Sequence, residues 1–164
     1  MSECVVRTAT KADAPAITEL LNHYIETSTS LFILEPQTVD ERLAWLDQRS
    51  ERHPALVAEI DGAFAGWGAL SVHKPRAGYR HSADTSVYVR PDLHRRGVGR
   101  AILTELIARA RAVGHHTLIA LCCTESAPSI ALHEMLGFER AGELREVGRK
   151  FDRWLNITHL QLML

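Results

Sequence analysis

The segment that most constrains the fold runs from an apolar strand, through a loop with two glycines, into an amphipathic helix. It reads "VYVRPDLHRRGVGRAILTELIARARAVG" over residues 87–114, and Gly97 and Gly99 lie between arginines and an apolar repeat of helical spacing. The first turn of a helix presents unpaired N–H groups and a partial positive charge, and glycines let an anion approach the backbone. The segment therefore predicts either a phosphate site or a plain helix start with solvated arginines, and on its own it favours neither.

Two common nucleotide-binding motifs do not fit this loop. Ile102 stands where the dinucleotide fingerprint GxGxxG has its third glycine, and no Gly-Lys-Ser/Thr follows as in a P-loop. If the loop binds phosphate, we expect a ligand that is neither a dinucleotide nor a nucleoside triphosphate.

Composition restricts the class of protein. The chain has 164 residues, which suits one domain, and a formal net charge of −1, which argues against a nucleic-acid binder with its usual basic excess. The first residues contain no apolar leader region, and no apolar run approaches the ~20 residues of a membrane span. Cys4, Cys122 and Cys123 lack zinc-site spacing and are expected to be reduced thiols. We therefore expect a cytoplasmic protein with no membrane partner.

Apolar periodicity and turn signals predict the element order β-α-α-β-β-β-α-β-α-β-β. Thr10 with Asp13, and Thr38 with Glu41, mark the starts of two helices that extend to about residues 28 and 52. Asp61-Gly62 predicts a hairpin. The other predicted elements are strands at 4–9, 81–90, 116–123, 138–147 and 154–163 and helices at 97–114 and 126–137. The order predicts an α/β protein with a central mixed sheet covered by helices.

Nearly the whole chain resembles a known family. "VYVRPDLHRRGVGRAIL" resembles the acetyl-CoA pyrophosphate loop of the Gcn5-related N-acetyltransferases, and "SAPSIALHEMLGFERAGEL" resembles their later strand–helix segment. "NHYIETST", "EPQT", "LVAEIDG", "HEMLGF" and "GRKFDRWLNITHLQL" are similar to the phosphinothricin and methionine sulfoximine acetyltransferase branch. The resemblance implies one N-acetyltransferase domain over residues 1–164. It also implies a mostly antiparallel mixed sheet of about seven strands flanked by about four helices, acetyl-CoA as co-substrate, no metal, and a homodimer.

The same resemblance assigns residues to the acetyl-CoA site. Backbone groups of Val87, Tyr88 and Val89 would pair with the pantetheine arm like an added strand. The pyrophosphate would be surrounded, largely through N–H groups, by Arg95, Arg96, Gly97, Val98, Gly99 and Arg100. Ser126 stands where relatives often carry an asparagine that contacts the cofactor, and His94 stands where the loop usually begins with Gln or Arg.

Two residues are candidates for proton transfer. Asp84 stands where the branch usually has Glu, and it is the candidate base; an ion pair with Arg80 or His81 is the alternative. His133 stands where many relatives carry a Tyr near the thiol, and it is the candidate acid; an ordinary helix histidine is the alternative. Tyr88 is a weaker candidate acid. Cys122 and Cys123 are expected to be inert core thiols.

The acceptor site would lie on and before the strand that carries Asp84. The resemblance places substrate contacts at Lys74, Pro75, Arg76, Asp84, Thr85 and Ser86. Lys74, Arg76 and Arg80 could hold a carboxylate and an oxidised sulfur or phosphinate group, since guanidinium forks suit paired oxygens; a solvated basic loop is the alternative. His115 and His116 are adjacent and would face opposite ways on a strand, so no metal site is predicted.

These observations predict an enzyme that transfers acetyl from acetyl-CoA to the α-amine of a small amino-acid analogue, such as methionine sulfoximine, methionine sulfone or phosphinothricin. The amine would attack directly, without an acyl-enzyme. Two alternatives stay open at this point: an N-acetyltransferase for another amine (antibiotic, polyamine or peptide N-terminus), and a non-catalytic sensor that binds acyl-CoA.

Overall fold

A seven-stranded sheet forms the centre of the protein in a computed structural model that describes residues 4–164. The strands are β1 (Cys4–Thr8), β2 (Ala55–Ile60), β3 (Ala63–Val72), β4 (Ser82–Val89), β5 (Thr117–Cys123), β6 (Glu139–Lys150) and β7 (Arg153–Met163). Their order is β1-β2-β3-β4-β5-β7-β6, and only β4 and β5 run parallel. Residues 1–3, part of the segment in which no apolar leader is expected, lie outside the described range.

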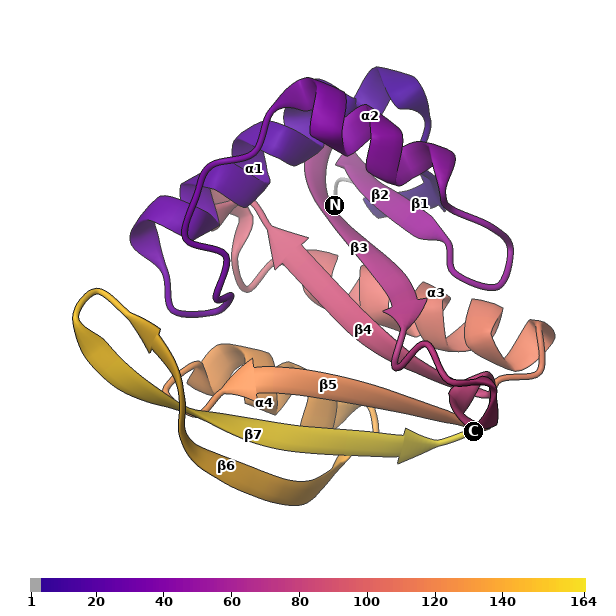
Figure 1. Ribbon diagram of the computed structural model, residues 1–164. Helices are drawn as coiled ribbons and strands as arrows, with labels where there is room; N and C mark the ends of the chain where they lie inside the picture. The colour runs from indigo at the N-terminus through magenta and orange to yellow at the C-terminus, as the bar shows by residue number, and fades with distance from the viewer. Residues whose placement is uncertain (1–3) are drawn as a thin grey trace.

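Four α-helices cover the two faces of this sheet (Figure 1). They are α1 (Ala14–Thr27), α2 (Val39–Asp47), α3 (Val98–Ala112) and α4 (Ala127–Met135). Because side chains alternate between the faces of a strand, each face has its own core. Ile17 and Leu21 of α1 pack with Trp67 on one face, while Ile102 and Leu106 of α3 pack on the other. Within residues 4–164, no helix is both long and apolar enough to cross a membrane.

The predicted fold class and element order are confirmed, with one helix end misplaced. Thr38 and Glu41 form the expected capping box, since the Thr38 hydroxyl accepts from the Glu41 N–H and the Glu41 carboxylate accepts from the Thr38 N–H. The helix that begins there ends at Asp47, not near residue 52. Its apolar residues stop at Leu46, the next seven residues are polar, and Pro54 disfavours helical backbone at the residue before it.

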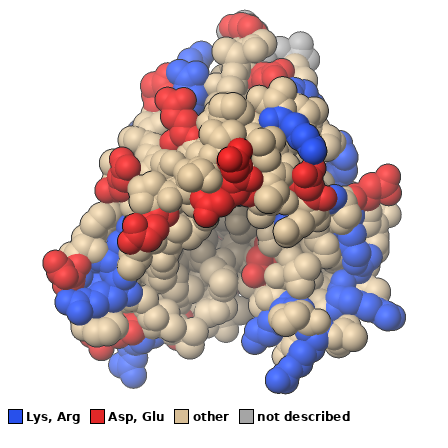
Figure 2. Space-filling model, turned by 45° about the horizontal axis from the view of Figure 1, so that its top comes forward, with Lys and Arg blue, Asp and Glu red and all other residues tan. Residues whose placement is uncertain are grey.

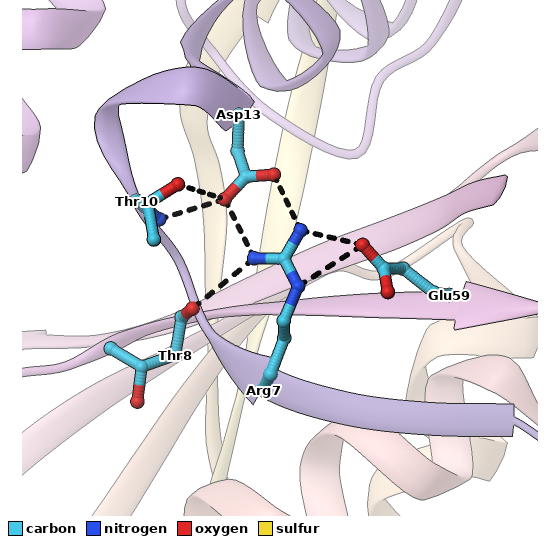
Figure 3. A network of polar contacts seen from close by, with 5 residues as sticks. All are labelled: Arg7, Thr8, Thr10, Asp13 and Glu59. Atoms are coloured by element: carbon cyan, nitrogen blue, oxygen red, sulfur yellow. Dashed lines mark hydrogen bonds and ion pairs between the residues drawn. The ribbon is translucent and has the colours of Figure 1, made fainter. Parts of the chain in front are cut away.

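A partly buried ion network anchors the first strand to the second and to the start of α1 (Figure 3). The Arg7 guanidinium donates to both Asp13 carboxylate oxygens at 2.8 Å and to Glu59 Oε1 at 2.5 and 3.0 Å. Asp13 also accepts from the Thr10 backbone N–H at 2.7 Å. The hydrogen bonds from Arg7 lower the pKa of the Asp13 carboxyl. Asp13 therefore both caps the helix start, as the sequence predicts, and binds the strand beneath it.

The pairing of β4 with β5 stops early. Only Ser82, Ala83 and Asp84 of β4 pair with β5, although β4 continues to Val89. Beyond Asp84 the two strands diverge (Figure 1). The carboxyl-terminal half of β4 is therefore an open strand edge in the middle of the sheet.

Candidate active site

The open edge of β4 offers unpaired backbone groups. Arg90 N–H donates to the Ala65 carbonyl of β3, and backbone direction alternates along an antiparallel pair, so the groups of Val87 and Val89 point away from β3. Tyr88 faces β3 and pairs with Trp67. Of the three residues expected to pair with a pantetheine arm, Val87 has backbone groups without a hydrogen-bond partner within residues 4–164, whereas the Val89 carbonyl on the same side accepts the Tyr24 hydroxyl.

The loop after β4 offers a concentrated set of donors. None of the six backbone N–H groups of residues 95–100 donates a hydrogen bond to any group within residues 4–164. Gly97 is the N-cap of α3 and has a φ of 83°, a left-handed conformation that glycine adopts without strain. The side chains of Arg95, Arg96 and Arg100 are exposed around it. These groups fit a doubly charged phosphate ligand.

Two side chains hold this loop against β4. Tyr24 of α1 donates its hydroxyl to the Val89 carbonyl at 2.6 Å and lies 2.8 Å from His94 Nε2. The tyrosine therefore ties the end of β4 to the first residue of the loop motif, and His94 serves as its partner.

Asp84 is the last residue of β4 that pairs with β5. Its carboxylate forms a hydrogen bond with a histidine that the sequence did not identify as a candidate. His73 Nδ1 lies 2.6 Å from Asp84 Oδ1 and donates to it. Burial raises the pKa of the Asp84 carboxyl, while the bond from His73 opposes that shift. Arg80 and His81, the partners weighed from the sequence, bond to each other instead. A half-buried carboxylate with a raised pKa suits a proton acceptor.

His133 lies on the opposite face of the sheet at the same junction. It is 3% exposed, its Nδ1 donates to the Ser129 carbonyl at 2.8 Å, and its Nε2 accepts from the Thr85 hydroxyl at 3.2 Å. Desolvation lowers the pKa of the imidazole, while the hydrogen bond to the Ser129 carbonyl opposes that shift. Thr85 points toward this histidine, whereas Asp84 and Ser86 point to the other face.

A cavity of about 510 Å³ opens on the face that carries Asp84. It runs from α2 to the middle of β3 and β4, where Ser71 and Ser86 stand beside Asp84 in the sheet. Tyr88 lines it, stacked on Trp67 with ring centroids 4.9 Å apart, and burial raises the pKa of Tyr88 to about 12. Figure 2 shows a hollow on the face turned to the viewer, mostly uncharged with one acidic side chain at its edge, with acidic side chains above and Lys and Arg side chains below.

The structure brings together only part of the predicted acceptor set. Ser86 lines the cavity, and Asp84 is paired in the sheet with Ser71, another lining residue. Lys74, Pro75 and Arg76 are exposed in the connection between β3 and β4, where the Lys74 ammonium lies 5.4 Å from the Tyr79 ring. Arg42 of α2, absent from the predicted set, lines the cavity and is 5% exposed.

The remaining predicted residues, Ser126 and the cysteines, make ordinary structural contacts. Ser126 is the N-cap residue of α4, and its backbone N–H donates to the Cys123 carbonyl. Cys122 is buried, and burial raises the pKa of its thiol, as expected of an inert cysteine. Across residues 4–164, no group of three or more His, Cys, Asp or Glu side chains could hold a metal ion.

Two segments far apart in sequence close one end of this region. Lys150 at the end of β6 is 4% exposed, and its ammonium donates to the carbonyls of Ser28 and Leu31 at 2.5 and 3.1 Å. The Phe32 ring lies against Gly148, where an added Cβ would come within 2.0 Å of it. "NHYIETST" and "GRKFDRW" are therefore in contact, which no sequence pattern indicated.

Replacing Lys150 with methionine should lower the free energy of unfolding by about 2–3 kcal/mol, because two buried carbonyls lose a charged donor. In a domain of this size the loss corresponds to about 5–10 °C in Tm. Differential scanning calorimetry of Lys150→Met beside Arg149→Met, an exposed neighbour, measures it. Equal Tm values for the two variants would contradict the anchoring role.

Comparison with known proteins agrees with this geometry. The family model described as "Acetyltransferase (GNAT) family" matches residues 17–138. The chain is 38% identical, over 97% of its length and 94% of the relative's, to an L-methionine sulfoximine/L-methionine sulfone acetyltransferase of Salmonella typhimurium. It is 38% identical to a phosphinothricin N-acetyltransferase of Streptomyces viridochromogenes, covering 95% of this chain and 85% of that protein.

A solved structure extends the comparison to the fold. An acetyltransferase of Salmonella typhimurium, crystallised with its cofactor acetyl-CoA, superposes with a TM-score of 0.96 at 37% identity, over 99% of this chain and 95% of that one. The β4 edge, the loop at Gly97 and these relatives agree, and the chain belongs to the acetyltransferase (GNAT) family.

Proposed function

We propose that this protein is an N-acetyltransferase that moves acetyl from acetyl-CoA to the α-amine of a small amino-acid analogue of the methionine sulfoximine, methionine sulfone or phosphinothricin type. One observation carries the proposal: six free N–H groups at residues 95–100 lie beside an open β4 edge that begins at Asp84. The N–H groups could bind phosphate, the open strand edge could pair with an extended pantetheine arm, and the Asp84 carboxylate stands where that edge begins. The names of the relatives support the acceptor class.

Acetyl-CoA supplies an activated acetyl group, and the acceptor amine attacks it directly. The residues proposed to bind it are Val87, Tyr88, Val89, Arg95, Arg96, Gly97, Val98, Gly99, Arg100 and Ser126. Phosphates suit the N–H groups at Gly97, and amides of an extended chain suit the backbone groups of Val87 and Val89. The contribution of Tyr88 comes from its side chain, because its backbone is paired with β3.

Asp84 is the proposed base. An ammonium is not nucleophilic, so one proton must leave the amine, and the Asp84 carboxylate accepts it directly or through a water. The His73 imidazole fixes the orientation of this carboxylate. Lys74, Pro75, Arg76, Thr85 and Ser86 complete the proposed acceptor contacts, with Ser86 in the cavity wall and Lys74 contributing positive charge near Asp84.

His133 is the proposed group near the departing thiolate, acting beside Thr85. Replacing His133 with phenylalanine should lower kcat by about tenfold or more while leaving the affinity for acetyl-CoA within about twofold, because proton supply affects only the chemical step. Steady-state kinetics across pH, with Tm measured alongside, tests this. A fall in Tm with unchanged kcat at every pH would assign His133 a packing role only.

We further propose that residues 1–164 act as one catalytic domain in a cytoplasmic homodimer. The free cysteines are consistent with a reducing compartment. Exposed apolar side chains on the β6–β7 hairpin, at Leu144, Val147 and Trp154, offer a surface for a second copy. Light scattering at working concentration measures the oligomeric state.

Thiol release from acetyl-CoA, measured with a panel of amines, tests the activity. Release with methionine sulfone, methionine sulfoximine or phosphinothricin is expected. Release only with aminoglycosides, polyamines or peptides would replace the acceptor class. Tight binding of acetyl-CoA without release for any amine would indicate a sensor instead of an enzyme.

A further inference from the structure

Arg42 of α2 is a buried cation without an anionic partner. It is 5% exposed, and its guanidinium lies over the Trp45 ring at 4.5 Å and the Trp67 ring at 5.6 Å. Within residues 4–164, its one hydrogen bond runs from Nη2 to the Gln37 side-chain oxygen, and it forms no salt bridge. Arginine is almost never buried to this extent unless it is paired, because removing the charge from water is costly.

The unused donors of Arg42 belong to the cavity wall. Arg42, Trp45 and Trp67 all line the cavity. The Nε of Arg42 and the indole Nε1 of Trp67 are buried and lack hydrogen-bond partners. The Nη1 of Arg42 also donates to nothing within residues 4–164, but it is not among the buried atoms, so it is the end that a ligand can reach.

A neighbouring arginine, Arg49, packs on the same tryptophan but has acceptors for its guanidinium donors. Arg49 follows the end of α2, and its guanidinium also lies near the Trp45 ring, 4.4 Å from the ring centroid. Its guanidinium donates to the carbonyls of Trp45 and Leu70 at 3.2 and 3.3 Å. The hydrogen bonds of Arg49 thus explain its structural role. Most N–H donors of Arg42, in contrast, have no acceptor within residues 4–164, and its positive charge has no negative partner there.

We propose that Arg42 binds an anionic oxygen group of the acceptor substrate inside this cavity. The proposal rests on the proposed function and deepens it. A carboxylate or phosphinate placed against Nη1 would supply the missing negative charge, and paired oxygens match the guanidinium fork. The two tryptophans exclude water from the pair, which strengthens it.

The cavity that holds Arg42 extends to the part of the sheet next to Asp84. The cavity extends from Arg42 on α2, past Tyr88, to Ser71 and Ser86, which flank Asp84 in the sheet. An acceptor held by its anionic group at Arg42 would share this cavity with Tyr88, Ser71 and Ser86. Two groups share this chemistry: the α-carboxylate, common to every proposed acceptor, and the phosphinate of phosphinothricin.

The test compares Arg42→Met with Arg49→Met as the matched control. Acceptors are titrated calorimetrically into each enzyme saturated with coenzyme A, so that binding is read without turnover. The ligands are L-methionine sulfone, its carboxamide, and phosphinothricin. Wild type and Arg49→Met should bind the sulfone more tightly than its carboxamide. Arg42→Met should lose about tenfold to a hundredfold in affinity for the acid and change within about twofold for the carboxamide.

The Tm of each variant shows whether a loss of affinity comes from the binding site or from a less stable fold. Because Arg42 is an unpaired buried charge, Arg42→Met should keep or raise the Tm, whereas Arg49→Met should lower it. Loss for both acids assigns the carboxylate to Arg42, and loss for phosphinothricin alone assigns the phosphinate. Unchanged affinity for both acids in Arg42→Met would overturn the proposal. If no acceptor is acetylated yet the Arg42-dependent preference persists, the proposed function fails and the anion site stands.

Discussion

Asp84→Asn lowers kcat/KM for acetyl transfer by about 10²–10⁴-fold at neutral pH if Asp84 is the base, since this is the range that a positioned general base contributes. The amide keeps the shape of the carboxylate and cannot accept the proton. Acetyl-CoA binding should stay within about twofold, because the N–H groups of residues 95–100 and the β4 edge are untouched. Stopped assays for kcat/KM, with fluorescence titration of acetyl-CoA, measure both quantities.

The pH dependence provides the control for this variant. Burial raises the pKa of Asp84, and a base works only when deprotonated. The wild-type rate should therefore fall as pH decreases through that raised pKa, at a higher pH than for an exposed aspartate. Asp84→Asn should lack this acid limb. A variant with full activity, or one that keeps the limb, would assign the base to another group.

Gly97→Val raises KM for acetyl-CoA by about tenfold if the loop binds phosphate through its backbone. Nothing lies within 4 Å of an added Cβ at Gly97, so the effect comes from backbone conformation alone. A branched residue at a φ of 83° costs about 1–2 kcal/mol, and 1.4 kcal/mol corresponds to tenfold in affinity. Relief of that strain turns the N–H groups away from one another.

Gly114→Val is the matched control. Gly114 has a φ of 76° and open space around it at the other end of α3, so it carries the same strain far from the loop. It should lower Tm by a similar amount and leave KM for acetyl-CoA unchanged. Arg96→Ala should raise KM less than Gly97→Val does. A larger effect of Arg96→Ala would show that the arginine side chains, not the backbone, hold the phosphates.

The sequence was sufficient for the fold because its signals are local. The apolar repeat of α3, the Asp61-Gly62 turn and the Thr38 cap each fix an element within a few residues. The loop at Gly97 is also local, so its place between β4 and the start of α3 could be predicted. The end of α2 was misplaced because polar residues that follow a helix give no stop signal until Pro54.

The residues around the proposed acceptor site were harder to predict, because their contacts join segments that are far apart in the sequence. His73 meets Asp84 across β3 and β4, but the connection between these strands is too long to set the register from sequence. Arg42 shares a helix face with Trp45 and Leu46, three and four residues later, but its charge predicts an exposed side chain, whereas the structure buries it. Lys150 binds carbonyls about 120 residues earlier in the chain, a contact that periodicity does not encode.

The strand order sets a sequence of events during synthesis. β7, residues 153–163, lies between β5 and β6, so the edge of β5 opposite β4 stays open until β7 has been synthesised and pairs with it. Open edges recruit other chains, which makes the nascent protein vulnerable to aggregation at that stage. The loop at Gly97 is complete long before this point. The contacts of Lys150 with Ser28 and Leu31 form only later, so the proposed acetyl-CoA loop is complete before the region that Lys150 closes.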